Sequence, residues 1–174
     1  MLKKIVISIV FLILPVSFSF AKDFGGVRPE DRPCVANLIL NEEFNKSKIE
    51  NLFGTGKIYQ TEITKNENKK IWWGYKGATI VTVNNKIKLI GFMRKSSENN
   101  TLLKSNEGIS IGDKGDNILK VNGLPTYIQE NNTKDMNVTM YIYNQIGKIT
   151  NFLILDATNS VIAITFMSSD WYQL

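Results

Sequence analysis

The chain has 174 residues, with 21 Lys or Arg against 16 Asp or Glu, and it contains one cysteine and no histidine. The lack of histidine excludes Ser-His and Cys-His nucleophile systems and removes the commonest zinc ligand. The basic residues are scattered, so nucleic acid is not an expected partner. A single cysteine cannot form an intramolecular disulfide; it is expected to be a buried, small apolar side chain, with a mixed disulfide to a partner as the alternative.

Residues 1–21 have the pattern of an export signal. Two lysines precede an apolar run at residues 5–16, and Ser19 and Ala21 place small side chains at the −3 and −1 positions of a cleavage site. The run is shorter than the roughly 20 residues that span a membrane. We therefore expect a bacterial Sec-type signal peptide and a periplasmic or secreted protein with no integral membrane segment. A signal retained as an N-terminal anchor is the alternative.

The first half of the remaining chain predicts an irregular leader, a helix and four strands. Residues 22–33 (KDFGGVRPEDRP) are rich in Gly, Pro and charge and predict the leader. Residues 45–54 predict a short helix in which Ile49, Leu52 and Phe53 share one face and a glycine ends the helix. Segments rich in β-branched and aromatic residues predict the strands, and an Asn-Asn pair predicts a hairpin turn between the last two. These segments are 57–63, 69–76, 78–85 and 86–93.

The second half repeats this order. A polar stretch at residues 94–107 predicts a linker. Residues 113–123 predict a second short helix, with Asp113 as its N-cap, Ile118 and Val121 facing the core, and a glycine as its end. Four further strands are predicted by the same signals as before. They are expected at 126–130, 138–145, 148–156 and 160–167.

The two halves align with each other. Matching Gly54 to Gly123 superposes the apolar positions of the two helices, and both halves end on a Phe-Met dipeptide. One such unit has a marginal core by itself, whereas two side by side can share one. We therefore expect an α+β fold, built as a tandem repeat of a helix plus an antiparallel β-meander at residues 34–93 and 108–174. The helices should pack on one face of an extended antiparallel sheet, leaving the other face partly open.

The glycine-rich stretch at residues 108–125, GISIGDKGDNILKVNGLP, fits none of three common ligand motifs. It lacks the Lys-Ser/Thr pair of a P-loop, and its glycines do not have the spacing of the dinucleotide fingerprint. Counting from Asp113, it also lacks the ligand and glycine positions of an EF-hand. We interpret the stretch as the capping residues of the second helix and expect neither a cofactor nor a metal.

Catalysis would have to rest on carboxylates, since histidine is absent. The candidates for an acid–base pair are Glu42 with Glu43 and Asp113 with Asp116. The glutamates lie in a polar run before the first helix, and the aspartates are explained as helix-capping residues. No catalytic residue is therefore predicted, and we expect the protein not to be an enzyme.

The stretch GISIGDKGDNILKVNGLPT resembles a module of small exported bacterial proteins. It is similar to the BamE-like outer-membrane assembly lipoproteins and to the tandem-repeat β-lactamase inhibitory proteins. Lys114 stands where Ser or Thr is usual, and Cys34 lies too far past the predicted cleavage site to carry a lipid, which argues against a lipid-anchored assembly factor. Because known members bind proteins, the resemblance implies a protein-binding module of inhibitor, immunity or envelope-accessory type. The matching positions are Gly108, Ile109, Gly112, Ile118, Gly123 and Pro125.

The predicted strand at 69–76, KKIWWGYK, is the main candidate for a binding surface. Neighbouring side chains of a strand point to opposite faces, so one of its two tryptophans should lie on the open face of the sheet. Trp and Tyr dominate protein interfaces, so we expect a protein partner in the cell envelope. The alternatives are that both tryptophans complete the core, or that the face binds a glycan or a small ligand. The candidate partner-binding residues are Trp72, Trp73, Tyr75, Tyr141, Tyr143 and Trp171.

Overall fold

The computed structural model describes residues 34–93, 104–133 and 136–171. The predictions of a signal peptide, a leader and most of the linker fall on residues outside these ranges. The elements, in chain order, are α1 (Lys46–Phe53), β1 (Lys57–Ile63), β2 (Lys69–Gly74), β3 (Ala78–Val83), β4 (Lys86–Met93), α2 (Gly115–Asn122), β5 (Tyr127–Asn132), β6 (Asn137–Gln145), β7 (Lys148–Leu155), the 3₁₀ helix η2 (Asp156–Thr158) and β8 (Ser160–Ser168).

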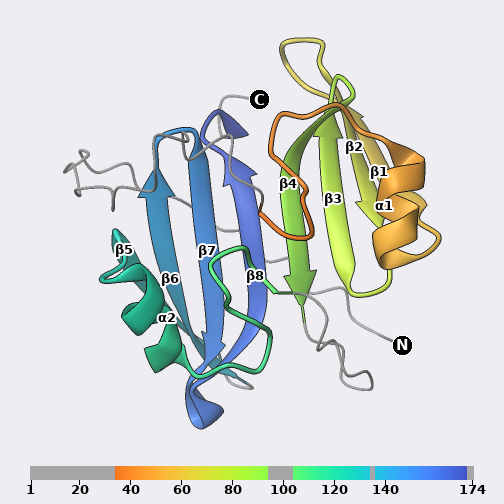
Figure 1. The fold of residues 1–174 in the computed structure, drawn as a ribbon. Coiled ribbons are helices and arrows are strands. Elements are labelled where there is room, and N and C mark those ends of the chain that lie inside the picture. The colour runs from red at the N-terminus through yellow and green to blue at the C-terminus, as the bar shows by residue number, and fades with distance from the viewer. Residues whose placement is uncertain (1–33, 94–103, 134–135, 172–174) are drawn as a thin grey trace.

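All eight strands belong to one antiparallel sheet in the order β1-β2-β3-β4-β8-β7-β6-β5 (Figure 1). Strands that follow one another in the sequence form hairpins, except at the centre of the sheet. There β4 pairs with β8 from Leu89↔Met167 to Met93↔Ala163. This long-range pairing joins the strands of the two halves of the chain without a break.

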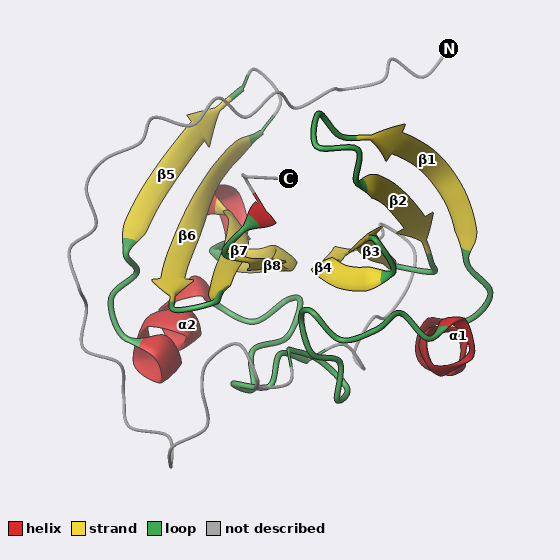
Figure 2. Ribbon diagram, turned by 90° about the horizontal axis from the view of Figure 1, so that it is seen from above, coloured by secondary structure: helices red, strands yellow, loops and turns green. Residues whose placement is uncertain are grey.

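The predicted fold class is wrong. The protein is mostly one eight-stranded antiparallel sheet with two short helices, and not a tandem repeat of a helix plus a meander. An eight-residue helix is about 12 Å long, whereas eight strands spaced about 4.8 Å apart span about 34 Å. Two such helices cannot cover the sheet, and Figures 1 and 2 show them at its flanks, with irregular chain at residues 34–44 and 104–114 over its middle. The main hydrophobic core therefore contains residues of both halves and crosses the β4–β8 junction.

The main core lies between the sheet and this covering layer, on what we call the helix face of the sheet. Ile49 of α1 and Ile118 of α2 are both buried, as predicted. Leu52 and Val121 are each 40% exposed, so the prediction that they face the core is wrong. A helix of two turns presents only a narrow stripe to the sheet, and these positions lie at its margin. The irregular chain supplies further buried residues, including Cys34, Val35, Leu38, Leu40 and Ile109.

The start of α2 differs from the prediction. The helix begins at Gly115, so Lys114 takes the N-cap position and makes no capping hydrogen bond through its side chain. Instead, the Asp113 carboxylate accepts the Ser110 N–H at 2.8 Å and stabilises the loop before the helix. Asp116 does lie in the first turn, where its charge suits the helix dipole. In α1 the N-cap is a side-chain cap, because Asn45 Oδ1 accepts the Lys48 N–H at 3.0 Å.

Glycine and asparagine end the elements as predicted. Gly54 and Gly123 follow the two helices with φ of 80° and 75°, a region that favours glycine. Asn84 and Asn85 both have positive φ and form the two-residue turn between β3 and β4.

Candidate binding surface on the concave sheet face

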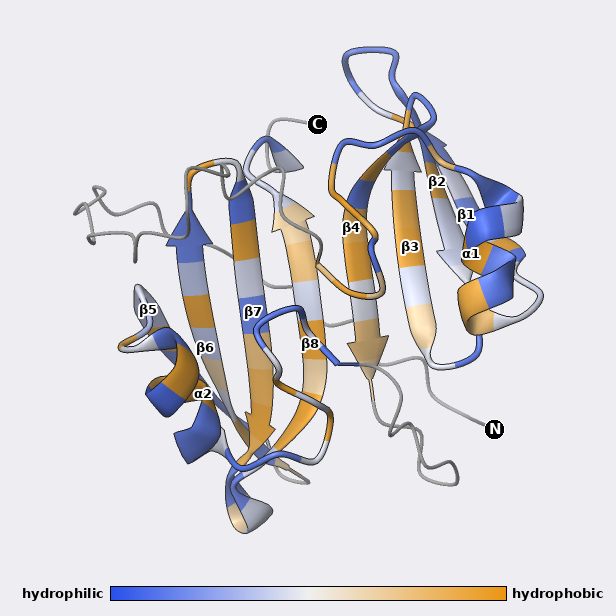
Figure 3. Ribbon diagram, viewed as in Figure 1, coloured by the Kyte–Doolittle hydropathy of each residue, from blue (hydrophilic) through white to orange (hydrophobic). Residues whose placement is uncertain are grey.

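The sheet curves so that the face opposite α1 and α2 is concave (Figure 2). We call this side the concave face. One row of directly paired residues crosses five strands on it, running Trp72↔Val81↔Leu89↔Met167↔Ile149. Hydrophobic residues follow one another directly in parts of the central strands (Figure 3). Because neighbouring residues of a strand point to opposite faces, both faces carry apolar side chains there. An antiparallel sheet with one solvated face normally alternates apolar and polar residues, so this second apolar face needs an explanation.

The centre of the concave face is a small hydrophobic cluster. Its buried members are Val81, Leu89, Ile142, Ile149 and Met167. Trp72, Met140 and Trp171 are only partly buried and pack against them. The face therefore combines a dry aliphatic floor with aromatic and sulfur-containing side chains that still reach its surface.

Three aromatic residues form what we call the aromatic corner of this face: Tyr59, Trp72 and Trp171. The rings of Trp72 and Trp171 meet edge to face, with centroids 5.8 Å apart and planes at 80°. The Tyr59 ring lies 6.2 Å from Trp72 and is tilted by 51°. Lys70 places its Nζ atom 4.5 Å above the Trp171 ring, a cation–π contact. These contacts bring β1, β2 and the segment after β8 together.

The segment after β8 is held in place by polar contacts. Asp170 accepts hydrogen bonds from Lys88 Nζ at 2.6 Å and from the Ser168 hydroxyl. Burial raises the pKa of Asp170, but the hydrogen bonds from Lys88 and Ser168 outweigh it, so the pKa is lowered overall. The carboxylate is therefore charged at neutral pH and fixes the neighbouring Trp171 against Trp72.

Two polar atoms of the concave face are buried without a hydrogen-bond partner among the described residues. They are Nε1 of Trp72, a donor, and Oδ1 of Asn151, an acceptor. Asn151 lies between Ile142 and Thr165 in the sheet, on the far side of the aliphatic floor from Trp72. Buried polar groups without partners are uncommon in folded proteins because their desolvation is not compensated.

The six predicted contact residues do not lie on one surface. Trp72 and Trp171 meet on the concave face. The other four belong to the main core or pack against it. Trp73 stacks on Phe44 with centroids 4.7 Å apart, and Tyr141 packs against the same core.

Two of those four are buried tyrosines. Tyr75 is 7% exposed and packs against Phe53. Tyr143 is equally buried and donates its hydroxyl to the Gly123 carbonyl at 2.8 Å.

Tyr59 was missed by the sequence analysis, although it is 57% exposed on the concave face. Strict alternation within KIYQTEI places it on the face opposite Gln60. A β-bulge between Ile58 and Gln60 makes Tyr59 the extra residue of β1, so that Tyr59 and Gln60 share the concave face, and the Tyr59 ring lies beside Trp72. No local sequence signal for this bulge is present.

We expect Tyr75→Phe to keep or raise the free energy of unfolding at neutral pH, by up to about 1 kcal/mol, because the Tyr75 hydroxyl is buried without a partner among the described residues. Burial, and then the charge of Glu50, raise the pKa of Tyr75 to about 12. Above the unfolded-state pKa of about 10, the wild type should lose stability progressively as the pH rises toward 12, and the variant should lose less. Chemical denaturation at neutral and alkaline pH tests this. A variant that is clearly less stable at neutral pH would contradict it.

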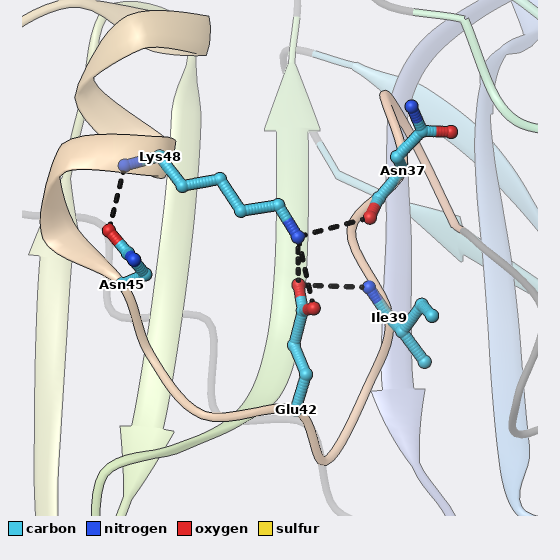
Figure 4. A network of polar contacts seen from close by, with 5 residues as sticks. All are labelled: Asn37, Ile39, Glu42, Asn45 and Lys48. Carbon is cyan, nitrogen blue, oxygen red and sulfur yellow. Dashed lines mark hydrogen bonds and ion pairs between the residues drawn. The ribbon is translucent and has the colours of Figure 1, made fainter.

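Three of the four carboxylates considered for catalysis, those of Glu42, Asp113 and Asp116, have structural partners. Glu42 accepts the Ile39 N–H at 3.2 Å and hydrogen bonds from Lys48 Nζ at 3.0 and 3.1 Å (Figure 4). Lys48 also donates to the Asn37 carbonyl at 3.3 Å. This network ties the irregular chain before α1 to the helix. Within the described residues, no group of three or more His, Cys, Asp or Glu is placed to hold a metal ion.

The cysteine is buried, as predicted, and lies near an ion pair. Lys148 of β7 is 2% exposed, and its Nζ lies 3.3 Å from Oε1 of Glu107 and 5.8 Å from the Phe166 ring centroid. Burial raises the pKa of the Cys34 thiol to about 12, while the charge of Lys148 acts in the opposite direction. A thiol in this state is a poor nucleophile. The ion pair between Lys148 and Glu107 thus has a structural role, because it anchors the loop that carries Glu107.

In residues 34–93, 104–133 and 136–171, no helix has both the length and the apolar character needed to cross a membrane.

Comparisons with known proteins identify a fold but no family. No protein-family model matches the chain, and no curated protein matches it in sequence. A cysteine-rich secretory protein from Staphylococcus aureus is similar in fold, with a TM-score of 0.50 at 8% identity, covering 82% of this chain and 49% of that one. This chain therefore spans about half the length of that protein.

Two further structures are more distant. One is an extracellular protein with an SCP domain from Bacillus anthracis, with a TM-score of 0.47 at 8% identity, covering 90% of this chain and 51% of that one. The other is a DUF4309 family protein from Bacillus subtilis, with a TM-score of 0.43 at 12% identity, covering 77% and 84%. At these identities a likeness concerns the fold alone.

Proposed function

We propose that this protein is an exported, non-enzymatic protein-binding module that uses the concave face of its sheet. Its role is that of an inhibitor, an immunity protein or an envelope accessory factor. The observation that carries the proposal is the aromatic corner, in which the exposed Tyr59 and the partly buried Trp72 and Trp171 lie beside a buried aliphatic floor, on the side of the sheet opposite both helices. Aromatic side chains that reach the surface beside a buried apolar floor are typical of an interaction site.

The chemistry of the face suits a protein partner. Partly exposed Trp and Tyr side chains are the usual anchors of protein interfaces, where they are surrounded by groups that exclude water. The aliphatic floor beside Trp72 and Trp171 excludes water in this way.

The ring geometry favours protein over glycan, the alternative ligand for this face. A sugar stacks on a flat, uncovered ring face. In the aromatic corner Lys70 lies over the Trp171 ring, and the ring planes of Trp72 and Trp171 are 80° apart. The corner thus presents ring edges and mixed contacts, which suit the irregular surface of a protein better than the flat side of a sugar.

Export is part of the proposal. It rests on the signal-peptide pattern at residues 1–21. It is also supported by the fold of the Staphylococcus aureus protein, because that protein is described as secretory. A periplasmic or secreted location gives the module access to partners in the cell envelope or outside it.

The test is affinity capture from an envelope extract with the mature protein, followed by measurement of the purified pair. Trp171→Ala is expected to weaken binding by about 30-fold, the effect of losing a hot-spot residue worth about 2 kcal/mol. Leu124→Ala, at an exposed apolar residue outside the aromatic corner and the apolar row, is the matched control and should bind as the wild type does. Both variants must first show the wild-type thermal melt.

Two outcomes would count against this function. Equal binding by the wild type and by Trp171→Ala would place the contact elsewhere. Failure to retain any protein, together with binding to a cell-envelope glycan that Trp171→Ala abolishes, would identify the alternative ligand class.

A further inference from the structure

Strand β1 forms one end of the sheet, and its outer edge is not paired with any described strand (Figure 2). It is also unusually apolar for an edge. Ile58, Tyr59 and Ile63 are exposed by 52%, 57% and 64%. An exposed edge strand offers a row of backbone donors and acceptors to another strand. The question is which strand would fit it.

The bulge in β1 determines which residues lie on each face. Its concave-face residues Lys57, Gln60 and Glu62 pair with Gly74, Trp72 and Lys70 of β2, which alternate along one face. Its helix-face residues Ile58 and Thr61 pair with Trp73 and Ile71.

Tyr59, the extra residue, also lies on the concave face. A Cβ atom added at Gly74 would be 3.2 Å from the Tyr59 ring.

The side chains of residues 57–62 therefore lie, in order, on the concave, helix, concave, concave, helix and concave faces of the sheet. This order is the same in both directions, with its centre between Tyr59 and Gln60. An antiparallel copy of the strand, related by a two-fold axis through that centre, meets it face for face. Lys57 then lies opposite the partner's Glu62, Ile58 opposite the partner's Thr61, and Tyr59 opposite the partner's Gln60. A shift of one residue in either direction puts the side chains of every pair except the central one on opposite faces.

We propose that β1 is a self-pairing edge through which two copies of this protein associate by antiparallel β1–β1 pairing. A regular strand of another protein alternates its faces throughout and cannot match two consecutive concave-face residues. A second copy carries the same bulge and does match. The charges agree with this partner, because each of the two symmetric Lys57–Glu62 pairs joins opposite charges. This inference does not depend on the proposed function.

The test is sedimentation equilibrium of the mature chain over a wide concentration range. We expect the wild type to dimerise reversibly, and we expect Lys57→Glu and Glu62→Lys to weaken dimerisation by at least about tenfold, because each places like charges opposite one another twice. Mixing the two variants should restore association as a heterodimer, since every cross-strand pair is again of opposite charge. Lys120→Glu and Glu130→Lys make the same charge changes at exposed sites outside β1 and should dimerise as the wild type does.

Glu62→Lys also removes the 3.3 Å ion pair with Lys70. If the melting temperature of Glu62→Lys is lowered, the test relies on the comparison of Lys57→Glu with Lys120→Glu. A wild type that stays monomeric would overturn the proposal. A dimer that is indifferent to both β1 variants, or a mixture of folded variants that does not associate, would overturn it as well.

Discussion

Replacing Glu107 by alanine is expected to lower the free energy of unfolding by about 3 kcal/mol, the effect of breaking a buried ion pair. The reason is the ammonium group that remains. Lys148 is 2% exposed, and Glu107 is the acid 3.3 Å from its Nζ. The Phe166 ring, 5.8 Å away, offers only a weak cation–π contact in compensation. Chemical denaturation of the wild type and the variant measures the difference.

Two controls separate the buried charge from the loss of side-chain contacts. Lys46→Ala removes an exposed ion pair with Glu50 on α1 and should cost less than about 1 kcal/mol. Adding Lys148→Met to Glu107→Ala removes the stranded charge and fills its space, so it should recover most of the loss. A Glu107→Ala variant as stable as Lys46→Ala would show that Lys148 is solvated or paired in some other way.

Gly56→Ala is expected to destabilise the fold by about 2 to 3 kcal/mol, at the upper end of the range for overpacking. A Cβ atom at this position would lie 2.2 Å from Cε1 and 2.5 Å from Cζ of Tyr75. The Tyr75 ring cannot move away freely, because it is buried against Phe53 of α1. The substitution therefore forces either the ring or the segment between α1 and β1 to shift. The midpoint and slope of denaturant unfolding measure the cost.

Gly91→Ala is the matched control for this prediction. Gly91 lies in β4, and the nearest atom to an added Cβ is 3.6 Å away, an ordinary contact. Alanine should be tolerated there and should even stabilise the strand by about 0.5 kcal/mol, because glycine loses more conformational entropy on folding. If both glycine variants behave alike, the predicted clash with Tyr75 does not occur.

Much of the secondary structure could be predicted from local signals. The strands expected at 57–63 and 86–93 coincide with β1 and β4, and the remaining strands agree to within two residues at each end. β-Branched and aromatic residues mark these strands, and asparagine or glycine marks the turns between them. Such signals act over a few residues, so strands and turns can be predicted from them without knowledge of the rest of the chain.

The fold class and the site were decided by contacts between residues far apart in the sequence. Alternation along 69–76 correctly separates Trp72 from Trp73, but it cannot say which of them faces the helices. That choice follows from the chain that packs on each side, with Phe44 covering Trp73 and Trp171 meeting Trp72. The same limit explains why Tyr75 and Tyr143 were grouped with surface residues, although the tertiary structure buries both.

By itself, then, the sequence determined the local elements of this protein: where strands run, where glycine ends each helix, and that Cys34 is buried. Only the tertiary structure decided that β4 pairs with β8 in one continuous sheet, that irregular chain covers its middle, and that Tyr59 joins Trp72 and Trp171 on the concave face. The physical reason is the range of the forces involved. Backbone propensities and turn conformations depend on neighbouring residues, whereas strand pairing and burial depend on which distant segments exclude water together.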